Sequence, residues 1–339
     1  MNLKESLLST GLFGLWVLIY LPCFVLRLLA PARQIHAYPP KWTRKVRIGS
    51  LWVLLVVTGF TPSIAAYQTQ SFPSAHELFP PLQADPAEPQ FGFQFGFPVS
   101  HAPIARIDVG DYLGIYRWAL GDAGALQLNV GGAINTRFDA TSSHNLQVID
   151  FYGNVPLDLR IGWFSLRSMF YHDSSHMGDD YLRENHIVDQ NSSWDAWREI
   201  LSAQVCRALR LYGGYQQAIY TLPNWNGRKA YQGGAEIYFN TSAKSFWHPY
   251  WANDVQAWER SNNNVTWTSQ LGFKTGDAFS NGRGISYFVQ FKTGPRYEGQ
   301  FYQNKETIWG AGLKFVLSDH LFQASSTPET GTTNPKPTP

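Results

Sequence analysis

One stretch of the sequence concentrates side chains that could do chemistry. Residues 171–181 read Tyr-His-Asp-Ser-Ser-His-Met-Gly-Asp-Asp-Tyr and contain two histidines, two serines and three aspartates. In nucleophilic catalysis a histidine takes the proton of a serine hydroxyl, while a carboxylate or an amide orients the imidazole ring. The spacing His172-x-Ser174 therefore predicts a hydrolase site in which Ser174 is the nucleophile and His172 is the base.

The third member of such a site is left open by the sequence. A carboxylate or an amide shortly after the His-Ser pair would serve, and the residues that qualify are Asp180, Glu184, Asn185 and Asn191. Nothing in the residue pattern chooses among these four.

Two other interpretations of the same stretch stay open. A cluster of histidine and carboxylate side chains can bind zinc, although the spacings here match no standard zinc site. The residues of this metal alternative are His172, His176, Asp179 and Asp180. The stretch could also be a structural loop at the mouth of a barrel, in which the His, Asp and Ser side chains hydrogen-bond to one another.

The element that carries the His-Ser pair is predicted to be a strand. From Ser165 onward the residues alternate in character, so that Arg167 falls on one face, and Leu166 and Phe170 fall on the other. Continued by two residues, the alternation puts His172 and Ser174 on the face of Leu166. Because arginine belongs in a watery lumen, we expect the face with the His-Ser pair to look toward lipid.

The same alternation recurs along most of the chain and predicts the fold. Clear examples are 126–134, 265–273, 285–291 and 311–317, with turn-rich clusters between the alternating segments. Such segments have about the ten residues that a tilted strand needs to cross a bilayer. We predict an all-β fold, an antiparallel transmembrane β-barrel of roughly 10–12 strands over residues 91–317, because closure removes exposed sheet edges.

Two features favour a membrane barrel over a soluble one. The polar face is mostly Gln, Asn, Ser, Thr and Gly, as in a wet lumen, and charged residues make up only 15% of the chain. Aromatic residues also gather at predicted strand ends, where interfacial girdles form. The members of this predicted girdle are Tyr112, Tyr116, Trp118, Tyr171, Trp247, Tyr250, Trp251 and Trp258. Charges on the lumen face, Glu236, Lys274, Lys292 and Lys314, are expected to form salt bridges.

The N-terminal region indicates export. Residues 1–66 are an apolar leader, in which 41–66 has the basic region, apolar run and small-residue exit of a signal peptide. The earlier run, 7–26, is long enough to be an extra inner-membrane anchor, which is the alternative. The net charge of +2 with no basic stripe argues against a nucleic-acid partner.

The remaining boundaries follow from composition. Residues 67–90 form a Pro-rich N-terminal segment, and residues 318–339 form a Ser/Thr/Pro tail that we expect to be disordered. The last predicted strand, 310–315, has the glycines and the terminal aromatic residue typical of a signal for the outer-membrane assembly machinery. The sequence therefore predicts a location in the outer membrane.

Two family resemblances extend these predictions. Residues 78–89, 171–181 and 212–215 resemble the bacterial envelope family catalogued as domain of unknown function 1207, a name that implies no activity. The outward His-x-Ser pattern of residues 172–174 also resembles that of outer-membrane phospholipase A and of the lipid A deacylases. That resemblance implies a lipid-ester hydrolase with membrane lipid as its partner, and calcium as a cofactor if the enzyme is phospholipase-like. In the phospholipase the serine is followed by Asn-Gly, whereas here Ser175 and His176 follow.

These observations lead to one functional prediction and one alternative. The chain is predicted to be an outer-membrane β-barrel that hydrolyses lipid esters at the membrane surface. The alternative is a barrel without enzymatic activity, either a pore or a structural component of the envelope. A pore requires an open lumen, so the two predictions differ in what fills the barrel.

Overall fold

The computed structural model describes residues 68–74, 78–121, 124–141, 143–188, 192–242, 245–276 and 284–316. The leader, the predicted signal peptide, the C-terminal tail and Asn191 lie outside these residues. Among the described residues, no helix is long and apolar enough to cross a membrane.

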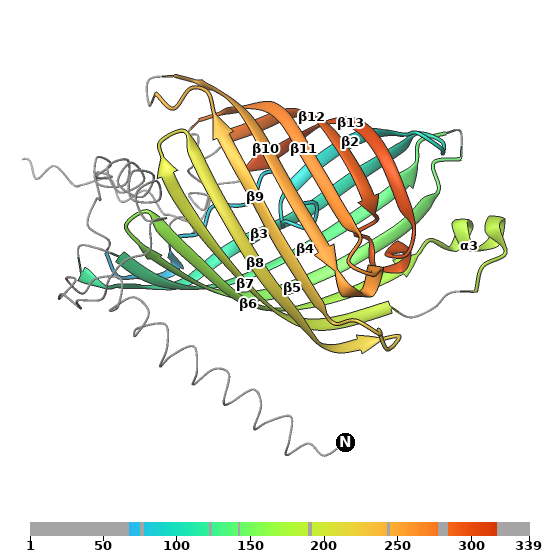
Figure 1. Ribbon diagram of the computed structural model, residues 1–339, viewed down its shortest axis with the longest axis horizontal. Helices are drawn as coiled ribbons and strands as arrows, with labels where there is room; N and C mark the ends of the chain where they lie inside the picture. The colour runs from blue at the N-terminus through green and yellow to red at the C-terminus, as the bar shows by residue number, and fades with distance from the viewer. Residues whose placement is uncertain are drawn as a thin grey trace, which may run out of the picture. The chain divides into compact units, whose positions relative to one another are not determined.

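In the described part of the chain, thirteen antiparallel strands form one sheet (Figure 1). The strands are β1 (Gln70–Ser74), β2 (Phe91–Pro98), β3 (Ile104–Ala119), β4 (Gly124–Asp139), β5 (Leu146–Ile161), β6 (Phe164–Met177), β7 (Ser192–Cys206), β8 (Leu209–Leu222), β9 (Lys229–Tyr238), β10 (Trp247–Trp258), β11 (Val265–Thr275), β12 (Gly284–Pro295) and β13 (Lys305–Val316). A short helix, α3 (Asp179–Asn185), follows β6, and 3-10 turns η2 (Glu259–Ser261) and η3 (Gly299–Phe301) precede β11 and β13.

The sheet closes into a barrel of twelve strands, β2 to β13. Each strand pairs with its neighbour in the chain, and β2 also pairs with β13, which leaves no open edge between the first and last barrel strands. The predicted all-β antiparallel barrel is therefore confirmed, at the upper end of the predicted strand count. β1 lies outside this ring and pairs with β3 at residues 114–117, beyond the point where β2 ends.

Alternation along each strand separates a polar interior from an apolar exterior. On β12, for example, Val289 is 56% exposed on the outer wall, whereas the next residue, Gln290, is 6% exposed and faces the lumen. The outer wall carries exposed apolar side chains on every side of the barrel, among them Val155, Leu201 and Leu271. This is the inverse of a soluble protein, and it is what a barrel surrounded by lipid requires.

The prediction of salt bridges in the lumen is confirmed for Lys292 and Glu236, whereas Lys314 donates to the carbonyl of Gln83 at 2.6 Å. Lys292 contacts Glu306 at 3.1 Å, and Arg210 contacts Glu236 at 3.3 Å. Lys274 and Lys314 are also buried in the lumen. Because each charge is withdrawn from bulk water, such pairs hold the barrel wall only while both partners are present.

The prediction of an aromatic girdle is wrong for three tyrosines and for Trp258, which packs against the buried cluster around Trp194. Tyr112, Tyr171 and Tyr250 are 6%, 4% and 0% exposed and face the lumen. Tyr112 illustrates the reason, because its ring lies 4.2 Å from the guanidinium of Arg167 and so packs on the interior charge network. Trp247 and Trp251 are exposed on the outer wall, where a girdle residue belongs.

The Pro-rich segment before the barrel folds into the lumen. Residues 78–90, hereafter the plug, include Phe79 and Leu82, both completely buried against Ile200 and Tyr212. Prolines at 80, 81, 86 and 89 lack the backbone N–H that a ladder needs, so this segment cannot continue the sheet and its carbonyls need other donors.

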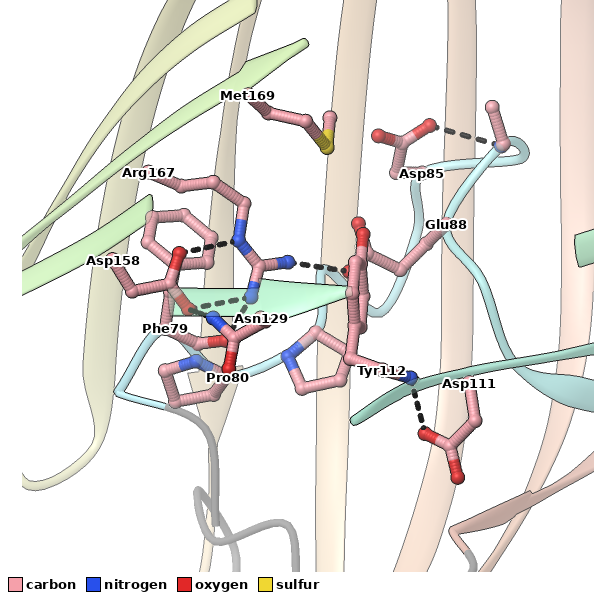
Figure 2. Close-up of polar contacts among 12 residues, drawn as sticks. Phe79, Pro80, Asp85, Glu88, Asp111, Tyr112, Asn129, Asp158, Arg167 and Met169 are labelled. Carbon is pink, nitrogen blue, oxygen red and sulfur yellow. Dashed lines mark hydrogen bonds and ion pairs between the residues drawn. The ribbon is translucent and has the colours of Figure 1, made fainter. Parts of the chain in front are cut away.

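Arginines of the barrel wall supply those donors, and Figure 2 shows one of them, Arg167. Arg167 donates to the carbonyl of Phe79 at 3.1 Å and to Asp158 at 2.8 Å. Arg210 donates to the carbonyls of Pro80 and Pro81 at 2.8 and 3.2 Å. These bonds join the plug to β6 and β8 and explain why arginine side chains lie on the inner wall.

The plug also brings two carboxylates into the lumen. Asp85 forms an ion pair with Arg198. Glu88 lies 3.5 Å from Arg167, and burial raises the pKa of Glu88 to about 7 although the guanidinium acts in the opposite direction. Next to Asp85, a cavity of about 40 Å³ lined by Arg198, Gln232 and other polar groups remains. That space admits a few water molecules.

Candidate functional site

The residues of the predicted site occupy the outer wall of β6. His172, Ser174 and His176 alternate with Asp173 and Ser175, which are 8% and 0% exposed and face the lumen. The pairing of β6 with β5 and with β7 proceeds without a register shift, so no bulge interrupts the alternation. The expected orientation of the His-Ser pair, on the face of Phe170, is therefore confirmed.

His172 is held by a carboxylate on the neighbouring strand. His172 and Asp195 stand opposite each other in the β6–β7 ladder, and Nδ1 of the imidazole lies 2.7 Å from Oδ1 of the aspartate. The histidine side chain is 53% exposed and the aspartate side chain 33%. When Nδ1 carries the proton and donates a hydrogen bond to the carboxylate, Nε2 keeps its lone pair and can act as a base.

Ser174 is hydrogen-bonded to the other histidine of the segment. Its Oγ lies 2.9 Å from Nε2 of His176, two residues further along β6 on the same face. His172 is two residues away in the opposite direction. Ser174 therefore stands between two imidazoles, one that contacts its hydroxyl and one that is oriented by a carboxylate.

Three of the four residues predicted as the third member have partners other than His172. Asp180 pairs with Arg183 within α3, Glu184 accepts a hydrogen bond from the Asn145 amide at 2.7 Å, and the Asn185 amide donates to the carbonyl of Tyr181. Asn191 lies outside the described residues. Asp195 is thus the partner of His172 in this structure, and the four sequence candidates did not include it. The register of the β6–β7 hairpin would have predicted this contact. That register cannot be read from the sequence, because residues 178–191 separate the two strands.

The metal alternative gathers no support from the geometry. Within the part of the chain that the structure describes, no group of three or more His, Cys, Asp or Glu side chains is placed to hold a metal ion. His172, His176 and Asp180 each contact a different partner, so the residues of the alternative do not form one cluster.

The second serine of the segment has a structural role on the inner wall. Ser175 Oγ donates a hydrogen bond to Asp150 and accepts one from the backbone N–H of Gln300 at 3.1 Å. Gly299 also donates its backbone N–H to Asp150. These bonds fasten η3 inside the barrel mouth, and they account for Ser175 without any catalytic role.

An open apolar trough adjoins His172 on the outer wall. It has a volume of about 460 Å³ and spans β3 to β6, with Val109, Ile134 and Phe151 among its lining residues. Gly153 lines it directly opposite His172 in the β5–β6 ladder. The predicted site is therefore bordered by a surface on which an apolar ligand can lie.

Another polar group lies on the same outer wall, nearer the beginning of β6. Ser168 Oγ donates to Glu199 Oε1 at 2.7 Å, and the indole N–H of Trp197 donates to the same oxygen. Phe170 separates this group from His172 on β6. Ser168 and Glu199 resemble Ser174 and Asp195 in type and orientation but have no histidine, which makes them internal comparisons for the predicted site.

Comparison with protein families identifies a relationship that extends over most of the chain. The family described as "Protein of unknown function (DUF1207)" matches residues 56–317. The chain belongs to this family. No curated protein matches the chain by sequence.

Solved structures with a similar fold are outer-membrane barrels of low sequence identity. Outer membrane phospholipase A from Escherichia coli is 11% identical and gives a TM-score of 0.46, with 67% of this chain and 93% of that chain covered. The Salmonella typhi outer membrane phospholipase dimer with bound calcium gives the same identity and score, covering 68% and 93%. The NanC porin is 13% identical with a TM-score of 0.40, covering 67% and 100%. At such scores, these likenesses support no statement about activity.

Proposed function

We propose that this DUF1207 protein is a lipid-ester hydrolase of the outer membrane, with Ser174 as nucleophile and His172 as general base. The observation that carries the proposal is the 2.7 Å contact between His172 and Asp195, two residues from Ser174 on the outward face of the wall. A carboxylate bound to Nδ1 fixes the imidazole in the form that can accept a proton at Nε2.

The reaction follows from these three side chains. Ser174 Oγ attacks the carbonyl carbon of the ester while Nε2 of His172 takes its proton, and Asp195 stabilises the imidazolium that forms. The tetrahedral intermediate expels the alcohol, which leaves with the proton from His172. Water, deprotonated by the same imidazole, then hydrolyses the acyl-enzyme and releases the fatty acid. We assign Ser193, which pairs with Ser174 in the β6–β7 ladder, as the hydroxyl donor to the developing oxyanion.

His176 holds the nucleophile in its resting position. Rotation about the first side-chain torsion of Ser174 moves Oγ between staggered positions, so the hydroxyl can turn from His176 toward His172. Catalytic hydrogen bonds are often incomplete until substrate binds. His176 has no carboxylate partner among the contacts of the described residues, and for this reason we assign the base to His172.

The surroundings of the site support a lipid substrate. The outer wall around His172 carries exposed apolar residues such as Val155 and Phe170. In outer-membrane barrels the longer connections lie on the extracellular side and the short turns on the periplasmic side. Here β6 leads into the connection 178–191, whereas β5 and β6 are joined by two residues. By this rule the end of β6 that carries Ser174 is the extracellular end. The predicted signal peptide and the proposed assembly signal on β13 agree with this location.

The filling of the lumen favours a hydrolase or a structural protein over a pore. The plug runs through the lumen with Phe79 and Leu82 buried, and a pore would require its displacement. A structural envelope protein stays the alternative, and it has no need of an imidazole–carboxylate pair on the lipid-facing wall.

Hydrolysis by purified, detergent-folded protein tests the proposal. Phospholipid and lipid A substrates are compared with and without calcium. We expect ester cleavage to fall at least about 10³-fold in Ser174→Ala and about 10²- to 10⁴-fold in His172→Ala. Ser168→Ala, an outward serine of the same strand, is the matched control and should retain wild-type activity. Absence of cleavage by wild-type protein under every condition would assign the barrel to the structural alternative.

A further inference from the structure

The trough beside His172 is formed by two outward positions without side chains. Gly132 of β4 and Gly153 of β5 are opposite each other in the ladder, and Gly153 is in turn opposite His172. One rung toward the barrel mouth, Ile134 and Phe151 form an apolar wall, 38% and 43% exposed. The rung containing the two glycines therefore forms a furrow, which is the part of the trough that crosses the strands and leads to the imidazole.

Packing within the protein does not account for the glycine at 153. A Cβ atom added to Gly153 meets no atom within 4 Å. Gly131, one position before Gly132 on β4, behaves differently, because a Cβ atom there would lie 2.5 Å from the ring of Tyr112. Gly131 is thus needed by the lumen packing, whereas Gly153 leaves space on the outer wall that nothing in the described chain fills.

We propose that this furrow binds a fatty acyl chain of the lipid substrate and so makes the enzyme selective for long-chain esters. This inference rests on the proposed function and names the part of the substrate that the site recognises. An acyl chain matches the furrow because it is apolar, unbranched and already present in the layer that surrounds the outer wall. The furrow crosses β3 to β6, about three strand separations or roughly 14 Å, and ends at the side chain that takes the proton of Ser174.

Filling the furrow tests the selectivity. Gly153→Phe puts a ring into the space above the strand, and the ratio of cleavage of a sixteen-carbon to a four-carbon p-nitrophenyl ester should fall at least tenfold. A tenfold change corresponds to the loss of about two buried methylene groups. Gly213→Phe is the control. Gly213 also faces outward, on β8, and a Cβ atom there makes only an ordinary contact, 3.8 Å from the Gln232 carbonyl. An unchanged ratio in Gly153→Phe, with wild-type folding, would overturn the inference.

A binding measurement separates this inference from the proposed function. Protein in mixed micelles is irradiated with a phospholipid that carries a diazirine on one acyl chain, and the crosslinked peptides are identified by mass spectrometry. We expect labelling of residues 124–161 to exceed that of β9 to β12 and to fall several-fold in Gly153→Phe but not in Gly213→Phe. Even labelling around the barrel, insensitive to Gly153→Phe, would refute the acyl site whether or not wild-type protein cleaves esters. Preferential labelling without any cleavage would keep the lipid site and refute the hydrolase.

Discussion

Replacing Asp195 by alanine removes the carboxylate that orients His172, and we expect the kcat for ester cleavage to fall about 10- to 30-fold. A hydrogen bond to a charged group contributes about 1.5–3 kcal/mol, and each 1.4 kcal/mol changes a rate tenfold. The contact is short, 2.7 Å, but the two side chains are 53% and 33% exposed, so solvent screening favours the lower end of that range. KM should stay unchanged, because Asp195 touches the imidazole and not the ester.

The assay is steady-state hydrolysis of a long-chain ester by folded protein, with Glu199→Gln as control. Glu199 is another outward carboxylate of β7, and it accepts a hydrogen bond from Ser168 rather than from a histidine. A double-mutant cycle sharpens the result. If Asp195 acts only through His172, the double variant Asp195→Ala, His172→Ala should be as slow as His172→Ala alone.

Two results would refute this reasoning. Full kcat in Asp195→Ala, together with an inactive Ser174→Ala variant, would show that the base does not depend on the carboxylate. Additive losses in the double variant would show that Asp195 acts on something other than His172, and His176 would then become the base to test.

Three further predictions concern the second histidine and the plug. His176→Ala should lower kcat less than tenfold, since His176 only holds the resting hydroxyl of Ser174, and a larger loss than in His172→Ala would reverse the two roles. Arg210→Ala leaves Glu236 buried without its cation and removes both bonds to the plug carbonyls, so urea unfolding should show a loss of about 3–5 kcal/mol; a loss below about 1 kcal/mol would contradict the proposed anchoring of the plug. Because the pKa of Glu88 rises from 4.5 to about 7 on folding, the folded state binds the proton more tightly, and stability should decrease as pH rises from 4.5 to 7, by at most about 3 kcal/mol. Glu88→Gln should remove that decrease in pH-dependent unfolding, and an identical pH profile in the variant would disprove it.

Alternation was sufficient to predict the barrel and the orientation of the His-Ser pair. Arg167 marked one face of β6 as the lumen, and the faces of His172 and Ser174 followed because no bulge intervenes. The same alternation put Tyr171 on the face of Arg167, so the sequence already predicted that Tyr171 faces the lumen. The prediction of Tyr171 as a girdle residue was wrong because it relied on the general tendency of aromatic residues to gather at strand ends and ignored this local alternation.

Other features depend on contacts that a local pattern does not contain. Asp195 meets His172 only because the β6–β7 register is set across residues 178–191, which include α3. The plug is a short Pro-rich segment whose partners, Arg167 and Arg210, are separated from it by about 90 and 130 residues. Its composition predicts that it is not a strand, and only the assembled barrel supplies the donors that bring it inside.

Covalent labelling with a fluorophosphonate probe tests the central claim most directly, because the probe reacts with a serine whose hydroxyl a neighbouring base has activated. After reaction with folded wild-type protein, mass spectrometry should locate the adduct on Ser174 and not on Ser168 or Ser175. His172→Ala should abolish that adduct while the barrel remains folded. No adduct on Ser174 in folded wild-type protein, or equal labelling in His172→Ala, would contradict the assignment of Ser174 and His172 as nucleophile and base.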